Sequence, residues 1–205
     1  MGYIFCLMGK SSSGKDSVYR RLLADQTLGL KKLVTGTTRP IREGEQNGVE
    51  YYFYTDVQLK ELQRSGRVVE CRAYHTAHGV WHYFTVAHEQ MDLLHQDYLT
   101  INTLEAYTKL RNYYGNDCLI PIYLEVEDGQ RLKRALEREM GEREPKYKEM
   151  CRRFLADEED FSRENLEREQ IEPIFQNVRL DETVEQITGY IRSVQEQVTL
   201  TYGSF

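Results

Sequence analysis

Short apolar runs along the chain alternate with longer, mostly polar segments. The run at 3–8 (Tyr-Ile-Phe-Cys-Leu-Met) predicts a buried strand, and the segment at 15–25 predicts a helix. The alternation continues beyond the first third of the chain, where we expect strands at 98–101, 119–126 and 174–175 and helices at 87–95, 103–113, 128–170 (broken near Gly141 and Pro145) and 181–197. Because alternating strands and helices form parallel sheets, this pattern predicts an α/β fold with a central parallel sheet and helices on both faces.

Residues 35–86 follow a different pattern. A polar, glycine-rich stretch leads into three runs of strand-forming residues, at 49–54, 68–70 and 81–86. One helix is expected among them, with Asp56 as its cap and Gly66 after its end. The segment therefore predicts a small β-rich lobe inserted between elements of the core, directly after a short core strand that begins at Leu33 and Val34.

The composition is that of a soluble globular protein. Of the 205 residues 40% are hydrophobic, and no apolar run approaches the ~20 residues that span a bilayer. The first apolar stretch has no basic leader, so we expect a cytoplasmic protein. Four cysteines without paired spacing indicate reduced thiols: Cys6, Cys71, Cys118 and Cys151. The net charge of −6 argues against binding along a nucleic-acid backbone, so neither nucleic acid nor membrane is an expected partner.

A glycine-bounded loop joins the first strand to the first helix. Its sequence, Gly9-Lys10-Ser11-Ser12-Ser13-Gly14-Lys15-Asp16-Ser17, contains the pattern G-x-x-x-x-G-K. Such a loop turns backbone N–H groups toward phosphate oxygens, the helix N-terminus adds partial positive charge, and the lysine neutralises the outer phosphates. The pattern predicts a nucleoside triphosphate site, and the expected ATP contacts are Gly9, Ser11, Ser12, Ser13, Gly14, Lys15, Asp16 and Ser17.

The residue after the loop lysine departs from the usual pattern. A hydroxyl at this position normally contacts Mg²⁺. Here the residue is Asp16, and Ser17 follows it. A carboxylate is a harder and more charged oxygen ligand, and beside a triphosphate it has an electrostatic cost unless a metal ion is bound. We therefore expect Asp16 and Ser17 to be the metal ligands.

A second motif lies in the lobe. The segment from Thr35 to Phe53 contains the pattern T-T-R-x-x-R-x-G-E-x-x-G-x-x-Y-x-F. Together with the phosphate loop, this long motif resembles guanylate kinase, and the order of the elements is similar over residues 1–195. The resemblance implies the P-loop nucleoside monophosphate kinase fold, in which a core carries an inserted GMP-binding lobe and a helical lid.

The resemblance also implies how the chain is divided. We expect one guanylate-kinase-like domain at 1–198 and a loosely ordered tail at 199–205. Within the domain the expected core covers 1–34, 87–127 and 171–198, the GMP-binding lobe covers 35–86, and the lid covers 128–170.

The acceptor side of the expected site lies in the lobe. By resemblance Arg39, Arg42 and Tyr51 hold the GMP phosphate, and a guanidinium fork suits that role chemically. By resemblance, Glu70 matches the family's base-reading glutamate. Its carboxylate can accept from guanine N1–H and from the exocyclic amine, whereas adenine, with an acceptor at N1 and no such amine, would be repelled. Further contacts to GMP are expected from Thr35, Tyr83, Thr85 and Asn102.

The donor side is expected in the lid. Arg131, Arg134 and Arg138 recur at i, i+3 and i+7, which places them on one helical face. The resemblance implies that Arg134 and Arg138, with Arg153 beyond the break, cover the transferring phosphoryl group and act with Lys15 as the catalytic residues. The alternative is an exposed helix with salt bridges, since glutamates interleave with these arginines. Asn177 is implied near the adenine of ATP.

One position departs from the family after the strand at 98–101. Family members usually have an aspartate near Asn102, close to the metal and the acceptor nucleotide, and here the residue is neutral. Together with Asp16, this leads to the hypothesis of a relocated carboxylate, lost at the strand end and gained in the phosphate loop. A separate metal site at Cys71, His75, His78 and His82 is the weaker interpretation, because their spacing is not a standard zinc pattern.

The resemblance implies an ATP:GMP phosphotransferase that makes GDP and ADP with Mg²⁺. Its substrates would be ATP and GMP, and the protein would be a monomer or a homodimer. Two alternatives stay open on the sequence. A guanylate-kinase-like module can bind partners with little or no catalysis, and a related kinase can use another phosphate acceptor.

Overall fold

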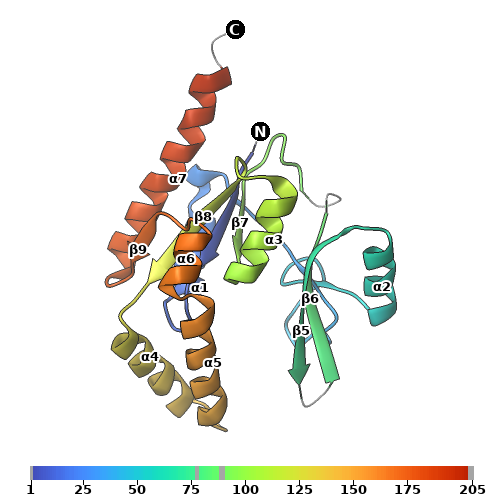
Figure 1. The fold of residues 1–205 in the computed structure, drawn as a ribbon, viewed down its shortest axis with the longest axis vertical. Helices are drawn as coiled ribbons and strands as arrows, with labels where there is room; N and C mark the ends of the chain where they lie inside the picture. Colours follow the sequence, from blue (N-terminus) through green and yellow to red (C-terminus); the bar gives the residue numbers. More distant parts are fainter. Residues whose placement is uncertain (1, 77–78, 88–90, 203–205) are drawn as a thin grey trace.

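A five-stranded parallel sheet forms the centre of the protein (Figure 1). The computed structural model describes residues 2–76, 79–87 and 91–202, and the strands lie in the order β2-β7-β1-β8-β9. The bounds are β1 Ile4–Met8, β2 Lys31–Lys32, β7 Tyr98–Ile101, β8 Leu119–Glu125 and β9 Ile174–Gln176. Every neighbouring pair is parallel, so the carboxyl ends of the strands meet at one edge of the sheet, where β1 leads into the phosphate loop.

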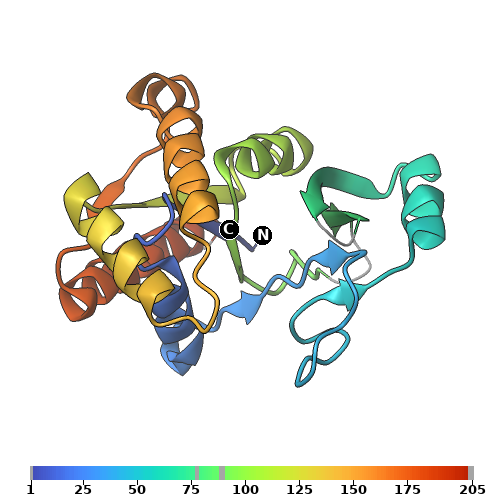
Figure 2. The ribbon, with the colours of Figure 1, turned by 90° about the horizontal axis from the view of Figure 1, so that it is seen from below.

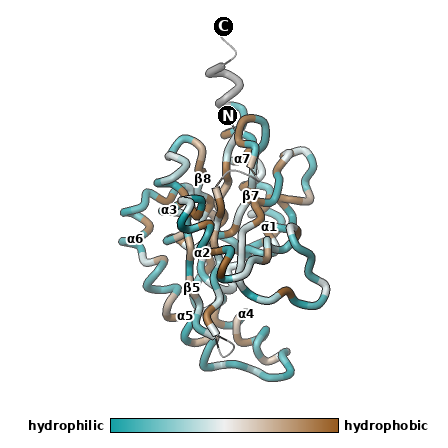
Figure 3. Tube along the Cα trace, turned by 90° about the vertical axis from the view of Figure 1, so that its right-hand side faces the viewer, coloured by the Kyte–Doolittle hydropathy of each residue, from teal (hydrophilic) through white to brown (hydrophobic). Residues whose placement is uncertain are grey.

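The side chains of β1 alternate between two apolar clusters, which explains why the whole strand is buried. Ile4, Cys6 and Met8 pack on the face covered by α3 (Leu104–Tyr114) and α6 (Arg163–Arg168). The other face is covered by α1 (Lys15–Ala24) and α7 (Leu180–Tyr202), which pack on Phe5 and Leu7. Helices therefore cover both faces, as predicted, and Figure 3 shows apolar positions along the central strands β7 and β8.

A second sheet forms a lobe to one side of the core (Figure 2). Its strand order is β4-β3-β6-β5, and the bounds are β3 Gly36–Thr37, β4 Tyr52–Phe53, β5 Val68–Thr76 and β6 Gly79–Val86. β5 and β6 pair antiparallel with an irregularity after Val68, and this register places Glu70 opposite Thr85. β5 is the edge strand that contacts α3 of the core, so the lobe meets the core along β5.

Helix α2 (Asp56–Arg64) lies on the outer side of the lobe. Its cap is Thr55 and not the expected Asp56. The Thr55 hydroxyl accepts from the Gln58 N–H, and the Gln58 side chain accepts from the Thr55 N–H, which together make a capping box. Threonine and aspartate are both common caps, and the reciprocal bond to Gln58 selects the threonine.

Two of the three helices in the predicted lid region, 128–170, lie at the end of the sheet, whereas the third, α6, packs on the core. α4 (Asp128–Met140) and α5 (Tyr147–Asp160) are separated by 141–146, which contains the predicted break near Gly141 and Pro145. They pack against each other and lie close to the phosphate loop (Figure 2). Phe161, directly after α5, is buried in the core, so the end of this helix is attached to the body of the protein.

Several predicted elements differ from the observed ones. Residues 91–95 of the helix expected at 87–95 are not helical, and 93–95 form a turn in which the Asp92 carboxylate accepts from the Leu94 N–H and bonds the His95 side chain. Residues 88–90 lie outside the described residues. The short core strand expected to begin at Leu33 and Val34 is β2, which instead ends at Lys32. After Leu33 the chain leaves the core sheet for the lobe. The strand expected at 49–54 is limited to β4.

Helix α7 is longer than predicted. It continues to Tyr202, so residues 199–202, expected in a loosely ordered tail, are helical. No glycine or proline occurs between Gly189 and Gly203, so nothing in 190–202 stops the helix. Residues 203–205 lie outside the described part of the chain. A 3-10 turn, Gln26–Leu28, joins α1 to the segment that forms β2.

Candidate active site

The phosphate loop has a backbone that depends on glycine. Gly14, the residue before α1, has φ 89°, and at Gly9 a Cβ atom would come within 2.5 Å of the Leu124 carbonyl oxygen. The hydroxyls of Ser12 and Ser13 are buried and have no hydrogen-bond partner among the described residues. Buried polar groups are normally paired, so these two hydroxyls indicate a site built for a polar ligand. The helix start behind them is suited to an anion.

Lys15 is held inside this loop. Its ammonium donates to the carbonyl oxygens of Gly9 and Lys10, at 2.6 and 2.9 Å. Burial lowers the pKa of Lys15, and the nearby carboxylates of Asp157 and Asp16 act in the opposite direction. The lysine is therefore positioned at the loop as predicted, close to a carboxylate from the lid.

The lid contacts the loop through two acidic residues of α5. The Asp157 carboxylate accepts a hydrogen bond of 2.6 Å from the Ser11 N–H of the loop. Next to it, Glu158 forms ion pairs with Lys10, at 2.5 Å, and with Arg131. Thus a carboxylate takes up one of the backbone donors that a phosphate group would use. Sequence reasoning missed both acids, since nothing in the local sequence links α5 to a loop 146 positions earlier.

The four lid arginines singled out from the sequence, Arg131, Arg134, Arg138 and Arg153, have different environments. Arg131 is 1% exposed, donates to the Ser11 carbonyl oxygen and lies over the Phe154 ring, 4.5 Å from its centroid. It therefore fixes the lid to the loop. Arg138 and Arg153 line a small cavity together with Ser11, which brings these two predicted residues to the phosphate loop. Arg134 is half-buried on α4, and its predicted catalytic role stays a prediction.

On the acceptor side Arg39 is the central residue. It is 3% exposed and makes two hydrogen bonds to the Glu45 carboxylate, at 2.8 and 2.7 Å. Its guanidinium lies 5.3 Å from the ring centroid of Tyr51, and Tyr51 packs edge-on against Tyr83 at 5.5 Å. The structure thus brings together three of the predicted GMP contacts, Arg39, Tyr51 and Tyr83. The role of Glu45 was missed, although it lies within the T-T-R…G-E motif.

Arg42 and Tyr51 complete this end of the lobe. The Arg42 side chain is exposed, and its backbone N–H donates to Glu45 at 2.8 Å. The Arg39 bonds, with the Arg42 N–H, lower the pKa of Glu45 to about 2. Burial raises the pKa of the Tyr19 hydroxyl in α1, and the electrostatic effect of Tyr51 acts in the same direction.

A buried carboxylate marks the other end of the acceptor side. Glu70 is 2% exposed, and its two oxygens are bonded by the Thr85 hydroxyl at 3.0 Å and by Arg72 Nε at 3.1 Å. The predicted pair Glu70 and Thr85 is therefore in contact. Arg72 was missed, although its position two residues after Glu70 on a strand places both side chains on the same face. Thr35 is half-buried, and its carbonyl oxygen accepts from the Tyr52 N–H.

The two asparagines lie at the carboxyl edge of the core sheet. Asn102 is 4% exposed, and its amide donates to Thr100 Oγ1 at 3.3 Å and to Cys6 Sγ at 3.7 Å, while its Oδ1 has no partner among the described residues. Asn177 donates to the Ser13 carbonyl oxygen at 2.7 Å, so it supports the phosphate loop from behind. Its predicted place near adenine stays a prediction.

The predicted metal ligands begin α1. Asp16 is exposed, and its carboxylate has no hydrogen bond within the described ranges, whereas Ser17 is half-buried. A free carboxylate beside a phosphate loop is a suitable oxygen ligand for a hard divalent cation. No cluster of three metal-binding side chains occurs in the described part of the chain, and His78 lies outside it. Similarly, no described helix is long and apolar enough to span a bilayer.

Comparisons with known proteins identify relatives of part of the chain. The guanylate kinase of Neisseria gonorrhoeae is 44% identical over 61 residues, which are 30% of this chain and 29% of that protein. The guanylate kinase of a Jannaschia species is 40% identical over 70 residues, or 34% and 31% of the two chains. The matched segments thus span less than a third of these curated relatives.

The wider likeness covers nearly the whole chain. A crystal structure of guanylate kinase from Anaplasma phagocytophilum superposes with a TM-score of 0.62 at 20% identity, covering 94% of this chain and 85% of that one, and this likeness shows the fold. The family model for guanylate kinase matches residues 2–194. The chain therefore belongs to the guanylate kinase family.

Proposed function

We propose that this protein transfers the γ-phosphoryl group of ATP to GMP, giving ADP and GDP. The observation that carries the proposal is the buried Glu70 carboxylate in the same lobe as the Arg39–Tyr51–Tyr83 cluster. A nucleoside monophosphate has a phosphate that suits the cationic and phenolic cluster, and a guanine edge has two N–H donors that suit the carboxylate. An adenine edge presents an acceptor where guanine has N1–H, so AMP would leave Glu70 opposed by an acceptor.

The chemistry needs no nucleophile from the protein. An oxygen of the GMP phosphate attacks the γ-phosphorus, a new P–O bond forms, and the bond from the γ-phosphorus to the β,γ-bridging oxygen breaks to release ADP. Lys15 and the loop N–H groups hold the outer phosphates of ATP, while Arg138 and Arg153 stabilise the charge of the transferring group. Arg39 and Arg42 orient the acceptor phosphate, so catalysis consists of positioning and charge stabilisation.

The residues present fit a bound Mg²⁺. Asp16 and Ser17 would hold it, and the ion would neutralise negative charge on the phosphates of ATP. The exposed carboxylate of Asp16 is the strongest support, because it has no other partner among the described residues. The relocated carboxylate hypothesis is thus retained in the proposal, with Asn102 as the neutral position.

A coupled assay of ADP release tests the proposed function. ATP and Mg²⁺ are held constant, and GMP, dGMP, AMP, CMP and UMP are compared as acceptors. We expect turnover with GMP, and turnover of the guanine nucleotides alone would support the base-reading role of Glu70. Arg39→Met should lower kcat/KM for GMP by about 10²-fold or more, because a buried, charged phosphate ligand is lost. Arg64→Met changes an exposed arginine of α2 in the same lobe and should leave activity unchanged. A folded chain without turnover on any acceptor would contradict the proposal.

A further inference from the structure

Arg72 is the one arginine that directly contacts the base-reading carboxylate among the described residues. Its Nε donates to Glu70 Oε2 at 3.1 Å, and the Arg72 and Glu70 side chains are 16% and 0% exposed. The two terminal nitrogens of Arg72 have no hydrogen-bond partner within the described ranges. Four terminal N–H donors therefore remain available next to a carboxylate whose proposed partner is a base.

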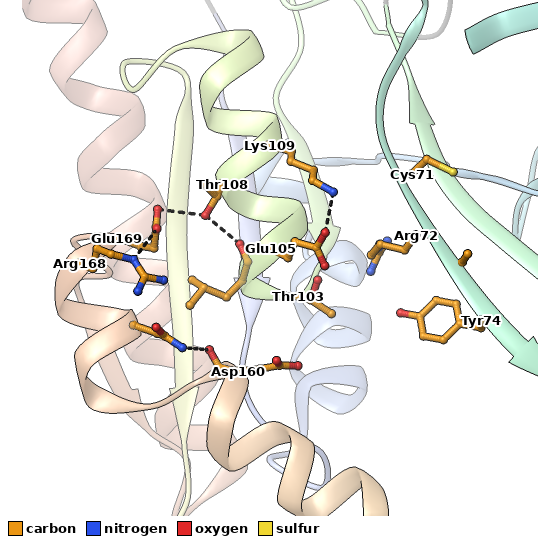
Figure 4. A pocket seen from close by; sticks show the side chains of 13 residues that line it. Cys71, Arg72, Tyr74, Thr103, Glu105, Thr108, Lys109, Asp160, Arg168 and Glu169 are labelled. Carbon is orange, nitrogen blue, oxygen red and sulfur yellow. Dashed lines mark hydrogen bonds and ion pairs between the residues drawn. The ribbon is translucent and has the colours of Figure 1, made fainter.

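The Glu70–Arg72 pair faces the core. Burial raises the pKa of the Cys6 thiol on β1 to about 12, and the charges of Arg72 and Glu70 act on the same thiol with smaller and opposite effects. β5, which carries both residues, packs against α3 of the core. Arg72 also lines a cleft of about 600 Å³ between β5 and α3, where Thr103 and Glu105 lie on the opposite wall (Figure 4).

The edge of guanine that Glu70 is expected to bind has three polar groups in a row. The exocyclic amine and N1–H are donors, and O6, next to N1, is an acceptor. A carboxylate with a guanidinium beside it presents the complementary row of acceptor, acceptor and donor. We propose that Arg72 is a specificity-determining residue that donates to O6 of the acceptor base while Glu70 accepts from N1–H and the amine. This inference rests on the proposed function.

The pairing predicts how other bases are treated. Adenine has a donor at position 6 and an acceptor at N1, so it meets a like group at both Arg72 and Glu70. Hypoxanthine keeps O6 and N1–H and lacks only the amine, so IMP keeps two of three contacts and should be a better acceptor than AMP. A buried site rejects a ligand strongly when its polar groups are left unmatched, so a second base-recognising residue beside Glu70 would increase the selectivity.

The test compares GMP with 6-thio-GMP, in which sulfur replaces O6 while N1–H and the amine are kept. Sulfur is a weak acceptor, so wild-type kcat/KM should fall about tenfold on 6-thio-GMP, as expected for one charged hydrogen bond. In Arg72→Met the ratio of the two substrates should approach one, and Arg72→Lys, which keeps a donor, should retain part of the preference. The ratio of kcat/KM for IMP to kcat/KM for AMP should fall from wild type to Arg72→Lys to Arg72→Met. Arg64→Met serves as the matched control.

The outcomes separate this inference from the proposed function. If Arg72 only held Glu70 in place, its loss would lower kcat/KM equally for GMP and for 6-thio-GMP. An unchanged ratio of these two kcat/KM values in a folded Arg72→Met variant would therefore overturn this inference and leave the proposed function intact. A wild-type chain with no turnover of GMP would overturn the proposed function and the inference together. Thermal unfolding of each variant establishes that it is folded before the ratios are compared.

Discussion

The contact between the lid and the phosphate loop predicts that Asp157 weakens ATP binding. Asp157 accepts from the Ser11 N–H at 2.6 Å, and its charge acts on Lys15, the lysine that ATP phosphates would approach. ATP therefore has to displace the Asp157 carboxylate from the loop N–H group that would otherwise bind a phosphate oxygen. Asp157→Asn keeps the size of the side chain and removes the charge that competes.

The magnitude follows from the type of bond. A hydrogen bond with a charged partner contributes about 1.5–3 kcal/mol, against about 0.5–1.5 kcal/mol for a neutral pair. Replacing the carboxylate by an amide thus weakens the competing contact by about 1 kcal/mol, which corresponds to about a fivefold lower Kd for ATP. Loss of the repulsion between carboxylate and triphosphate acts in the same direction, so fivefold is the lower end of the expected change.

Isothermal titration with ATP measures this change directly. Glu159→Gln is the matched control, because Glu159 is an exposed acid on the same helix. This substitution also removes one negative charge, but at a position away from the loop. We expect Asp157→Asn to bind ATP at least about fivefold more tightly than Glu159→Gln. Equal affinities for the two variants, or weaker binding by Asp157→Asn, would refute the reasoning that this carboxylate competes with phosphate.

Three further predictions concern pH, metal and the core. The pKa of Glu45 is lowered to about 2, so its pairing with Arg39 stabilises the fold fully above about pH 4.5. The free energy of unfolding, measured by urea titration, should be higher for wild type than for Glu45→Gln at neutral pH. This difference should shrink as the pH falls from about 4.5 to about 2. Asp16→Ser should raise the Mg²⁺ concentration needed for half-maximal turnover, and unchanged Mg²⁺ dependence and turnover would end the relocated carboxylate hypothesis. Leu99→Ala removes a fully buried side chain of β7 and should lower the free energy of unfolding by about 2–5 kcal/mol, measured by urea denaturation, and a loss below 1 kcal/mol would contradict the assigned packing.

The elements that are written in contiguous sequence could be predicted. The phosphate loop lies between an apolar strand and a helix, and its glycines and Lys15 occur at fixed spacing, so its conformation follows from the local sequence. The lobe and its motif could be identified for the same reason. The alternation of strands and helices likewise gave the parallel sheet with both faces covered.

The missed features depend on contacts between distant parts of the chain. Asp157 and Ser11 are 146 positions apart, and no local pattern states that this acid reaches the loop. Arg72 was equally ambiguous, because a charged residue on an edge strand is most often solvated. The helix expected at 87–95 failed for a local reason, since the Asp92 side chain bonds backbone within its own turn and competes with a helix in 91–95.

The measurement that tests the central claim most directly is phosphoryl transfer from ATP with a radiolabelled γ-phosphate to unlabelled GMP. We predict that the label appears in the β-phosphate of GDP, and that Lys15→Met abolishes the transfer in a folded chain. Label that stays in ATP, or that is released only as inorganic phosphate while GMP is unchanged, would contradict the proposal that this protein is a GMP kinase.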